Sequence, residues 1–529
     1  MSTKTYDVLI VGAGPVGLLL ACELRLAGDV SVLVLERDPD LYNTENPWKT
    51  APLGTRGMNA LSNEAFYRRG LLDKVITPAQ WAKRPLDLEG SGFAGHFAGI
   101  MLDAAKVDRT GPFWKYKLAG PAFVPTITSL SSLVDVLLQR AEELGVKVRA
   151  GVEVTGLTQE DDSEEVVVHA ANDEVFRGRW VVGCDGGRSR IRKAAGFDFK
   201  GTDAELNGYT VMCDLEDPQN RLERAFKRTK NGMYATFWPG HFIAMEPMTN
   251  GVYDRSKELT KEEFQVIVRR VTGLDDLIVK SMGTTSTYTD RSMLATTYRK
   301  GRVLLAGDSA HIHSPLGGQG LNAGVGDAMN LGWKLGAVAT GSAPPGLLET
   351  YTQERHPIGA WVTEWTRAQV TTMKPDLHSQ AITKVMKDLI GTRDGTTYMT
   401  ERFWGLFQRY DLGLTDEKQK EHPLVGRSVP EFEFTDGSGR LGERMRSGRG
   451  LIINFGDGDQ SALSDLAQKW HSKVDYVTDD VKDVLGLRAL LVRPDGIVAW
   501  VAEGEPDLAL ARIELARWFG PETAVETQH

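Results

Sequence analysis

The sequence contains few cysteines: three in 529 residues, standing far apart at Cys22, Cys184 and Cys213. Because no Cys-x-x-Cys pair exists, a disulfide scaffold and a cysteine-rich zinc site are excluded, and a reducing compartment is favoured. No charged leader with a cleavage site precedes the first strand-like run, and no apolar stretch approaches the ~20 residues of a membrane span. We therefore expect a soluble, cytoplasmic protein without a membrane partner.

The sequence also lacks long runs of one charge. Lysine and arginine total 62 against 71 acidic residues, a formal charge of −9 spread along the chain. Without a basic stripe to neutralise phosphates, nucleic acid is not an expected partner. The histidines His96, His241, His311 and His313 lack carboxylates at ligand spacing, so no metal site is expected. No Gly-x-Ser-x-Gly elbow supports a hydrolase.

The first motif lies at the N-terminus. Asp7–Val11 is typical of a buried parallel strand, and it is followed by the glycine-rich segment Gly12–Gly17. Leu18–Leu26 has a helical pattern, and Val30–Leu35 predicts a second strand that ends at Glu36. This order of strand, glycine turn, helix, strand and acid indicates a dinucleotide site.

Each residue of this motif has a physical task. Gly12 permits the tight turn, Gly14 lets the backbone approach a pyrophosphate, and Gly17 allows close packing of the helix on the strand. The helix N-terminus offers free N–H groups to the anion. Glu36, at the end of the second strand, would accept hydrogen bonds from ribose hydroxyls and repel a 2′-phosphate. The site is therefore expected to bind the ADP half of FAD or NAD.

Two later segments favour a flavin. Trp180–Arg192 runs from a strand into an arginine-rich turn, and Gly301–Leu335 predicts a strand, a loop and a long helix to about Ala339. Asp308, at the carboxyl end of that strand, could bind the hydroxyls of a ribityl chain. The glycines before the helix would let a flat ring lie against the backbone, and the helix N-terminus would stabilise an anionic reduced flavin.

The three segments together resemble the group A flavoprotein monooxygenases, the aromatic hydroxylases related to para-hydroxybenzoate hydroxylase and phenol hydroxylase. GAGPVG resembles the family's GxGxxG, VGCDGGRSRIR its DG motif, and AGDSAHIHSPLGGQGLNAGVGDAMNLGWKL its GD motif. The resemblance covers roughly the first 400 residues and continues through Tyr351–Pro357. It implies FAD as cofactor, with NAD(P)H as a co-substrate that binds transiently.

The resemblance implies a cofactor site made of residues from all three motifs. Arg37 would lie beside the adenine, and Asp185 and Arg188 would flank the pyrophosphate and the nicotinamide path. The implied site residues are Gly12, Gly14, Pro15, Val16, Gly17, Glu36, Arg37, Asp185, Arg188, Gly307, Asp308, Pro315, Gly318, Gly320, Leu321 and Asn322. The sequence departs from the family at Leu130 and Val134, where members often carry Gln or Arg and Glu. Either a neighbouring serine or the backbone alone would make that contact with FAD.

The stretch between the DG and GD motifs shows strand-like alternation with many aromatic residues. Candidates for one wall of a substrate pocket are Tyr234, Phe237, Trp238 and Met245, together with Phe242 and Pro247. Each could instead belong to the core beneath a sheet, which is the more common place for an aromatic side chain. A second wall or lid is expected in Pro78–Pro112.

We expect an α/β protein with a Rossmann-like FAD domain, an inserted β-rich substrate domain and a C-terminal thioredoxin-like module. The FAD domain, with a helical connector at Trp361–Asp411, would comprise residues 1–76, 114–188 and 289–412. The substrate domain would comprise 77–113 and 189–288, and the C-terminal module 422–529. Because every cysteine precedes residue 214, the module could perform no dithiol chemistry.

In its length, its C-terminal tail and its helical connector, the chain looks most like the hydroxylases of polyketide antibiotics and the rifampicin monooxygenases. The resemblance implies hydroxylation of a bulky polycyclic aromatic compound through a flavin C4a-hydroperoxide, using NAD(P)H and O2. Baeyer–Villiger oxygenation of a polycyclic ketone and FAD-dependent dehydrogenation without O2 incorporation remain alternatives. No side chain is nominated as catalytic, and the chain is expected to be a monomer or homodimer.

Overall fold

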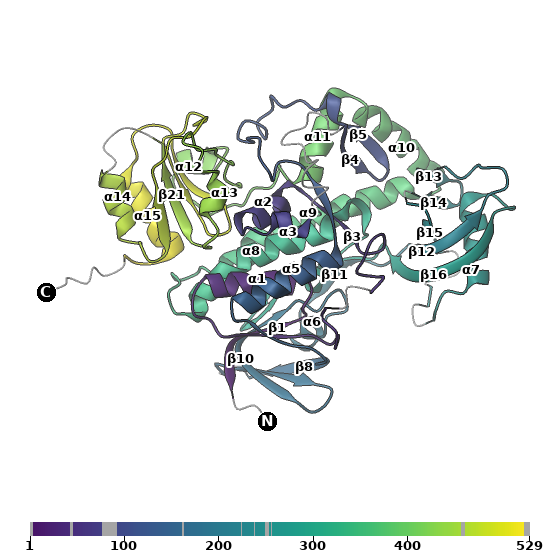
Figure 1. Ribbon diagram of the computed structural model, residues 1–529, viewed down its shortest axis with the longest axis horizontal. Coiled ribbons are helices and arrows are strands. Elements are labelled where there is room, and N and C mark those ends of the chain that lie inside the picture. The colour runs from purple at the N-terminus through teal and green to yellow at the C-terminus, as the bar shows by residue number, and fades with distance from the viewer. Residues whose placement is uncertain are drawn as a thin grey trace.

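The computed structural model describes residues 4–42, 46–76, 92–160, 163–223, 225–236, 238–248, 253–254, 257–455 and 461–522. Figure 1 shows a sheet around β1 and β10 at the bottom, a second sheet around β12 at the right, and the C-terminal elements at the left. The long helices α8 (Gln319–Ala339) and α9 (Glu349–Met373) run through the middle of the molecule. The fold is thus a mixed α/β arrangement around central helices.

The N-terminal sheet is built around parallel strands. Its order is β18-β19-β10-β1-β2-β7, with β8 and β9 added through β10. The strands are β1 (Thr5–Val11), β2 (Val32–Leu35), β7 (Lys147–Arg149), β8 (Val154–Gln159), β9 (Val166–Ala170), β10 (Val175–Gly183), β18 (Arg299–Lys300) and β19 (Val303–Leu305). Pairings of β1 with β2 and β10, and of β10 with β19, are all parallel. Because the carboxyl ends of parallel strands meet at one edge, the three motifs converge there.

Helices pack against this sheet and against one another. α1 (Pro15–Leu26) contacts both α8 and α5 (Leu130–Glu143). Shorter helices complete this part of the chain: α2 (Ala60–Arg68), α3 (Leu72–Val75) and α6 (Arg190–Ala194). The expected strand and helix after Gly12 are therefore present, with α1 beginning at Pro15 because proline suits the first helical position.

The second sheet is antiparallel, in the order β13-β14-β15-β12-β16. Its strands are β12 (Leu206–Glu216), β13 (Phe226–Thr229), β14 (Gly232–Ala235), β15 (His241–Pro247) and β16 (Ile278–Thr289). One face packs on α7 (Lys261–Thr272), where Tyr234 and Phe242 meet Phe264. The opposite face carries Met245, which belongs to a cluster with Leu316 of the GD motif. This alternation follows from the two-residue period of a strand.

Smaller sheets connect the large ones. β11 (Phe199–Thr202), β17 (Ser292–Ala295) and β20 (His311–Ile312) form one, while β3 (Thr55–Met58) pairs with β6 (Thr126–Ser129) and β4 (Phe93–Phe97) with β5 (Ile100–Asp103). α9, α10 (Leu377–Ile390) and α11 (Arg393–Trp404) make a helical connector that starts earlier than the expected Trp361. The β11-β17-β20 sheet crosses the domain boundary expected near residue 289, and the boundaries themselves stay a prediction.

The C-terminal elements form a four-stranded sheet in the order β22-β21-β23-β24. They are α12 (Glu417–Glu421), α13 (Leu441–Arg444), β21 (Gly450–Asn454), α14 (Ser461–Gln468), β22 (Val474–Val477), β23 (Ala489–Val492), β24 (Val498–Ala502) and α15 (Leu508–Phe519). Their core includes Trp333 of α8, so the tail packs directly on the central helices. None of the helices in the described ranges combines the length and hydropathy that a bilayer crossing requires.

A buried ionic network fixes the tail to α8 and α9. Arg493 donates two hydrogen bonds to Glu354, both at 2.8 Å, and Lys334 of α8 donates another to the same carboxylate at 2.8 Å. Asp495 accepts from Arg493 as well. Burial opposes the charged form, but Arg493 and Lys334 nevertheless lower the pKa of Glu354 to about 2. The network therefore stays ionised at neutral pH and holds the tail in place.

Candidate functional site

The N-terminal glycines differ in what surrounds them. A Cβ on Gly12, whose φ is +110°, would lie 2.4 Å from the Cys184 carbonyl oxygen, and one on Gly17 would lie 2.1 Å from the Gly12 oxygen. A Cβ on Gly14 would meet no atom within 4 Å. Gly12 and Gly17 thus serve chain packing, while Gly14 leaves open space beside the N-terminus of α1, as a pyrophosphate requires.

Glu36 is held beside this turn at the end of β2. Its Oε2 accepts from the Ala13 N–H at 2.7 Å and its Oε1 from the Asp38 N–H at 3.0 Å. Two backbone donors therefore fix the carboxylate where the first two strands end. Arg37, the next residue, is exposed.

Val16 has a different task from its neighbours in the glycine turn. A Cβ on Gly307 would approach the Val16 side chain to 3.2 Å, and one on Gly324 to 2.5 Å. Val16 therefore packs directly against two glycines of the GD motif. Pro15 begins α1 beside it.

Asp185 joins the DG motif to the GD motif. Its Oδ2 accepts from the backbone N–H groups of Arg190 at 2.6 Å and Ile191 at 3.2 Å, and its Oδ1 accepts from Ser309 Oγ at 3.0 Å. Both carboxylate oxygens are thus engaged by the chain itself. Arg188, in the turn between Asp185 and α6, is exposed, and its side chain is free to face a ligand in this part of the site.

Asp308 follows β19 and is exposed to the site. The half-buried Arg56, to which the motifs gave no role, is close enough to Asp308 for their charges to interact. Burial lowers the pKa of the Arg56 guanidinium, and the charge of Asp308 opposes that shift. Arg56 Nη1 also donates to the Leu53 and Thr55 carbonyls at 3.2 Å and 2.9 Å, which anchors it in β3. An isolated arginine carries no sequence signal, and only the pairing of β3 with β6 brings it here.

The start of α8 is a bare helix end. Gly317 and Gly318 have φ values of +74° and +62°, and no side chain caps the helix. A Cβ on Gly318 would meet no atom within 4 Å, and Pro315 beside it is exposed. The half-buried Gly320 and Leu321 form the first turn. Its free N–H groups and the positive helix end face open space, an arrangement that suits the anionic edge of a flat ring.

Asn322 ties this helix end to α2. Its Oδ1 accepts from the Asn59 N–H at 2.8 Å and from Ser62 Oγ at 2.7 Å, and its Nδ2 donates to the Gly57 and Gly318 carbonyls. The side chain therefore positions the glycine loop, leaving the backbone of the first turn for a ligand.

The buried Asp327 of α8 holds the loop of the GD motif in place. It accepts from the Gly307 N–H at 2.9 Å, from His311 Nε2 at 2.8 Å and from Arg355 Nε at 2.8 Å. Burial opposes its ionisation, but Arg355 and His311 together keep the pKa of Asp327 below its ordinary value. Neither Asp327 nor Arg355 could be assigned a role from the sequence, because their contact joins α8 to α9 and has no local pattern.

At the departure from the family at Leu130 and Val134, one neighbouring serine already has a structural task. Ser129 Oγ accepts from the Ser132 N–H at 3.1 Å and so caps α5. Val134 is buried in the main core. Contact with FAD through Ser131, through Ser132 or through the backbone alone stays a prediction.

The four expected substrate-wall residues lie in different places. Tyr234 packs in the core with α7, the alternative left open above, because strand alternation turns it away from the GD motif. Met245 lies on the face toward Leu316. Trp238 is 41% exposed and lies 5.8 Å from the His241 ring, centroid to centroid. Phe237 lies outside the described residues.

The arrangement fits a flavin dinucleotide better than a metal. Open space lies beside Gly14, Gly186 and Gly318, three backbone positions that the motifs bring to one edge of the sheet. Across the described ranges, no group of three or more His, Cys, Asp or Glu side chains is placed to hold a metal ion. A ligand bound here would contact mainly backbone N–H groups and helix ends, as FAD does in dinucleotide folds.

Comparisons with known proteins agree with this geometry. An FAD binding domain family matches residues 5–366, and an aromatic-ring hydroxylase C-terminal family matches residues 422–522. The chain is 46% identical to a monooxygenase of Claviceps purpurea, over 98% of both chains. It is 36% identical to rifampicin monooxygenase of Streptomyces venezuelae, covering 98% of this chain and 100% of that one. The solved structure of OxyS anhydrotetracycline hydroxylase from Streptomyces rimosus matches with a TM-score of 0.81 and 34% identity, covering 98% of this chain and 100% of that one.

Proposed function

Because the chain belongs to the family of FAD-dependent aromatic-ring monooxygenases, we propose that it hydroxylates a bulky polycyclic aromatic compound with NAD(P)H and O2. The observation that carries this proposal is the convergence of three open glycine positions with the bare N-terminus of α8. The oxygenation would follow the hydroperoxide route expected above.

The substrate class is inferred from relatives and from the chain. Two similar proteins are named for rifampicin and anhydrotetracycline. The face of the second sheet turned toward Leu316 is largely apolar, with Met233 and Met245 among its buried residues. A polycyclic polyketide would lie between this face and the flavin, where apolar contact orients the ring and excludes water.

Bound FAD would accept a hydride from NAD(P)H and activate O2. The chain itself would bind and orient the cofactor and the substrate. The turn at Gly14 and the N-terminus of α1 would hold the pyrophosphate, Glu36 a ribose, and Asp308 the ribityl chain. The N-terminus of α8 would stabilise negative charge on the ring, since a helix start carries about half a positive charge. Arg188, exposed beside the DG turn, would contact the nicotinamide during reduction.

The expected architecture is part of the same proposal. The parallel sheet around β1 would be the Rossmann-like FAD domain, the antiparallel sheet an inserted substrate domain, and the tail a thioredoxin-like module. We also retain the cytoplasmic location and a monomer or homodimer.

Oxygen isotope labelling tests the proposal. The purified chain is incubated with NADH or NADPH, ¹⁸O2 and a panel of polyketide phenols, and products are analysed by mass spectrometry. One labelled oxygen in a ring hydroxyl is expected. A labelled ester or lactone would support Baeyer–Villiger chemistry instead, and an oxidised product without label would support a dehydrogenase. A chain that neither carries FAD nor takes it up contradicts all three.

A further inference from the structure

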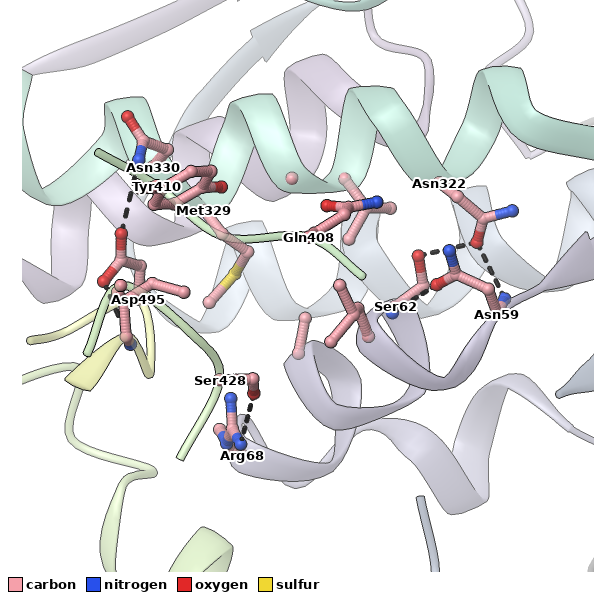
Figure 2. A pocket seen from close by; sticks show the side chains of 16 residues that line it. Asn59, Ser62, Arg68, Asn322, Met329, Asn330, Gln408, Tyr410, Ser428 and Asp495 are labelled. Atoms are coloured by element: carbon pink, nitrogen blue, oxygen red, sulfur yellow. Dashed lines mark hydrogen bonds between the residues drawn. The ribbon is translucent and has the colours of Figure 1, made fainter. Parts of the chain in front are cut away.

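A cavity separate from the open glycine positions lies between the central helices and the tail (Figure 2). It follows one face of α8, on which Asn322, Val325, Gly326, Met329 and Asn330 recur at helical spacing. α2 forms the facing wall, and the connector and tail close the remaining sides. From Asn322 to Asn330 the cavity extends along eight residues of helix, about 12 Å at 1.5 Å per residue.

Polar groups line both ends of the cavity. Asn59, Ser62 and Asn322 form a hydrogen-bonded group at the flavin end, while Asn330 and Asp495 lie at the tail end (Figure 2). The wall between them combines leucine, alanine, valine, methionine and isoleucine side chains with the polar side chains of Arg68, Gln408 and Ser428. The passage therefore offers hydrogen-bonding partners at its two ends and along its length.

The size and one unsatisfied group point to water as the occupant. The volume open to the centres of water molecules is about 60 Å³, and about 10–15 Å³ is enough for one. Arg68, only 3% exposed, lines the cavity, and its Nε has no hydrogen-bond partner among the described residues. Its Nη2 is already committed to Ser428 Oγ and the Val429 carbonyl, each at 2.9 Å. A buried guanidinium N–H without a partner is costly, and a water molecule would satisfy it.

A second cavity adjoins the first. The two share Leu61, Gln408 and Ser428 in their walls, and the second also touches Glu64 and Lys117 at the interface with the tail. The two cavities together therefore reach from the interface with the tail, beside Arg68, to the polar group at Asn322, and water filling both would form a path past the shared side chains. That group holds the glycine loop where the proposed flavin ring would lie.

We propose that a chain of water molecules fills this path and carries protons from the domain interface to the N-terminal end of α8. The inference rests on the proposed function. Hydroxylation of one C–H bond by O2 and NAD(P)H yields the phenol, NAD(P)⁺ and water, and it consumes one proton per turnover. The hydride from NAD(P)H supplies two electrons and one hydrogen, so the second hydrogen of the water must arrive as a proton.

Two variants that fill the first cavity from opposite walls test the inference. Ala65→Leu narrows the path from α2, and Ile497→Phe narrows it from the tail. Ile513→Phe is the matched control, since Ile513 lies in the same tail and is 58% exposed, away from the cavity. Stopped-flow absorbance of the FAD-loaded enzyme measures flavin reduction by NAD(P)H without O2, and then reoxidation by O2 with substrate, in H2O and in D2O.

We expect both filling variants to slow reoxidation at least fivefold and to raise its solvent isotope effect above twofold. Anaerobic reduction should stay within twofold of wild type, and the control should match wild type in both halves. A crystal structure of the wild-type holoenzyme should show ordered water beside Arg68 Nε. A dry path, unchanged reoxidation, or equal slowing of both half-reactions would overturn the inference. Absence of FAD or of NAD(P)H oxidation in the wild type would instead overturn the proposed function.

Discussion

At the scale of single residues, glycines were the most predictable part of the site. Gly12 and Gly17 could be assigned because the tight turn and the helix–strand contact each exclude a side chain, and the distances bear this out. The face on which a strand residue lies was less predictable. Tyr234 and Met245 are an odd number of residues apart, and only the pairing of β14 with β15 shows which one faces α7.

Gly14 offers a test that separates cofactor binding from folding. Gly14→Val should leave the free energy of unfolding of the apoprotein within about 1 kcal/mol, because its φ of −73° suits any residue and nothing lies nearby. FAD should bind at least tenfold more weakly, because the side chain occupies the space proposed for the pyrophosphate. Fluorescence titration with FAD measures this. Gly504→Ala, also in open space, is the control, and equal loss of FAD binding in both would count against the assignment.

Asp308 tests the other end of the cofactor. Asp308→Ala should give nearly colourless protein, with FAD binding weakened about tenfold or more, equivalent to about 1.4 kcal/mol per decade. The absorbance ratio at 450 and 280 nm of the purified protein reports FAD content, and apoprotein titration gives the Kd. Asp203→Ala, a change at an exposed carboxylate of the β11–β12 loop, is the matched control. Full yellow colour and unchanged affinity in Asp308→Ala would refute its role.

At the scale of elements, local patterns predicted helices and strands well where composition was periodic. The helix expected up to about Ala339 is α8, which begins at Gln319 and ends at Ala339. β2 begins at Val32 instead of Val30, because Ser31 is tied to Asp7 by three hydrogen bonds. The contacts that hold elements together were not predictable, since Asp327 and Arg355 lie 28 residues apart.

Arg355 of α9 forms one of the buried links to α8, through its ion pair with Asp327. Arg355→Leu should reduce the free energy of unfolding by about 3–5 kcal/mol, since it leaves the Asp327 carboxylate buried with His311 as its remaining ionisable partner. Urea denaturation followed by tryptophan fluorescence measures the loss. Arg367→Leu, on the same helix but bonded mainly to its own turn, should cost under about 1 kcal/mol. Similar losses in the two variants would contradict the importance of the ion pair.

At the scale of the whole molecule, the sequence predicted three sheet-bearing regions but not how they are joined. Arg493 lies 139 residues from Glu354, and the pair has no signal in either segment. The tail was expected to begin at residue 422. However, α12, which ends at Glu421, already packs on the tail, because the Gln419 side chain exchanges two hydrogen bonds with the Val501 backbone. Long-range ionic contacts of this kind become visible only in the folded chain.

The interface between α2 and the tail predicts a pH dependence of stability. Burial, with a contribution from Glu64, raises the pKa of Glu431 to about 7, although Arg68 and Arg440 oppose the shift. An acid whose folded pKa is raised stabilises the fold fully below its unfolded pKa, near 4.5, and this contribution is lost as pH rises toward 7. The loss amounts to about 3 kcal/mol.

Glu431→Gln keeps an oxygen for the Gly442 N–H but cannot ionise. The variant should therefore lose less stability than wild type between pH 5 and pH 7.5, as measured by denaturation at each pH. Glu433→Gln is the control: a hydrogen bond from Lys482 lowers the pKa of that partly exposed carboxyl, so its removal should not flatten the profile. Parallel profiles for wild type and Glu431→Gln would show that Glu431 is ionised in the fold.

The buried network of Arg493, Glu354 and Lys334 also limits how this enzyme can be recombined with its relatives. A chimera that received a foreign tail without an arginine at position 493 would leave Glu354 buried, with Lys334 as its remaining cationic partner and Asn330 as a hydrogen-bond donor. Grafts in this family should therefore exchange the tail together with the matching positions of both central helices, or replace the ionic set by apolar side chains of similar volume.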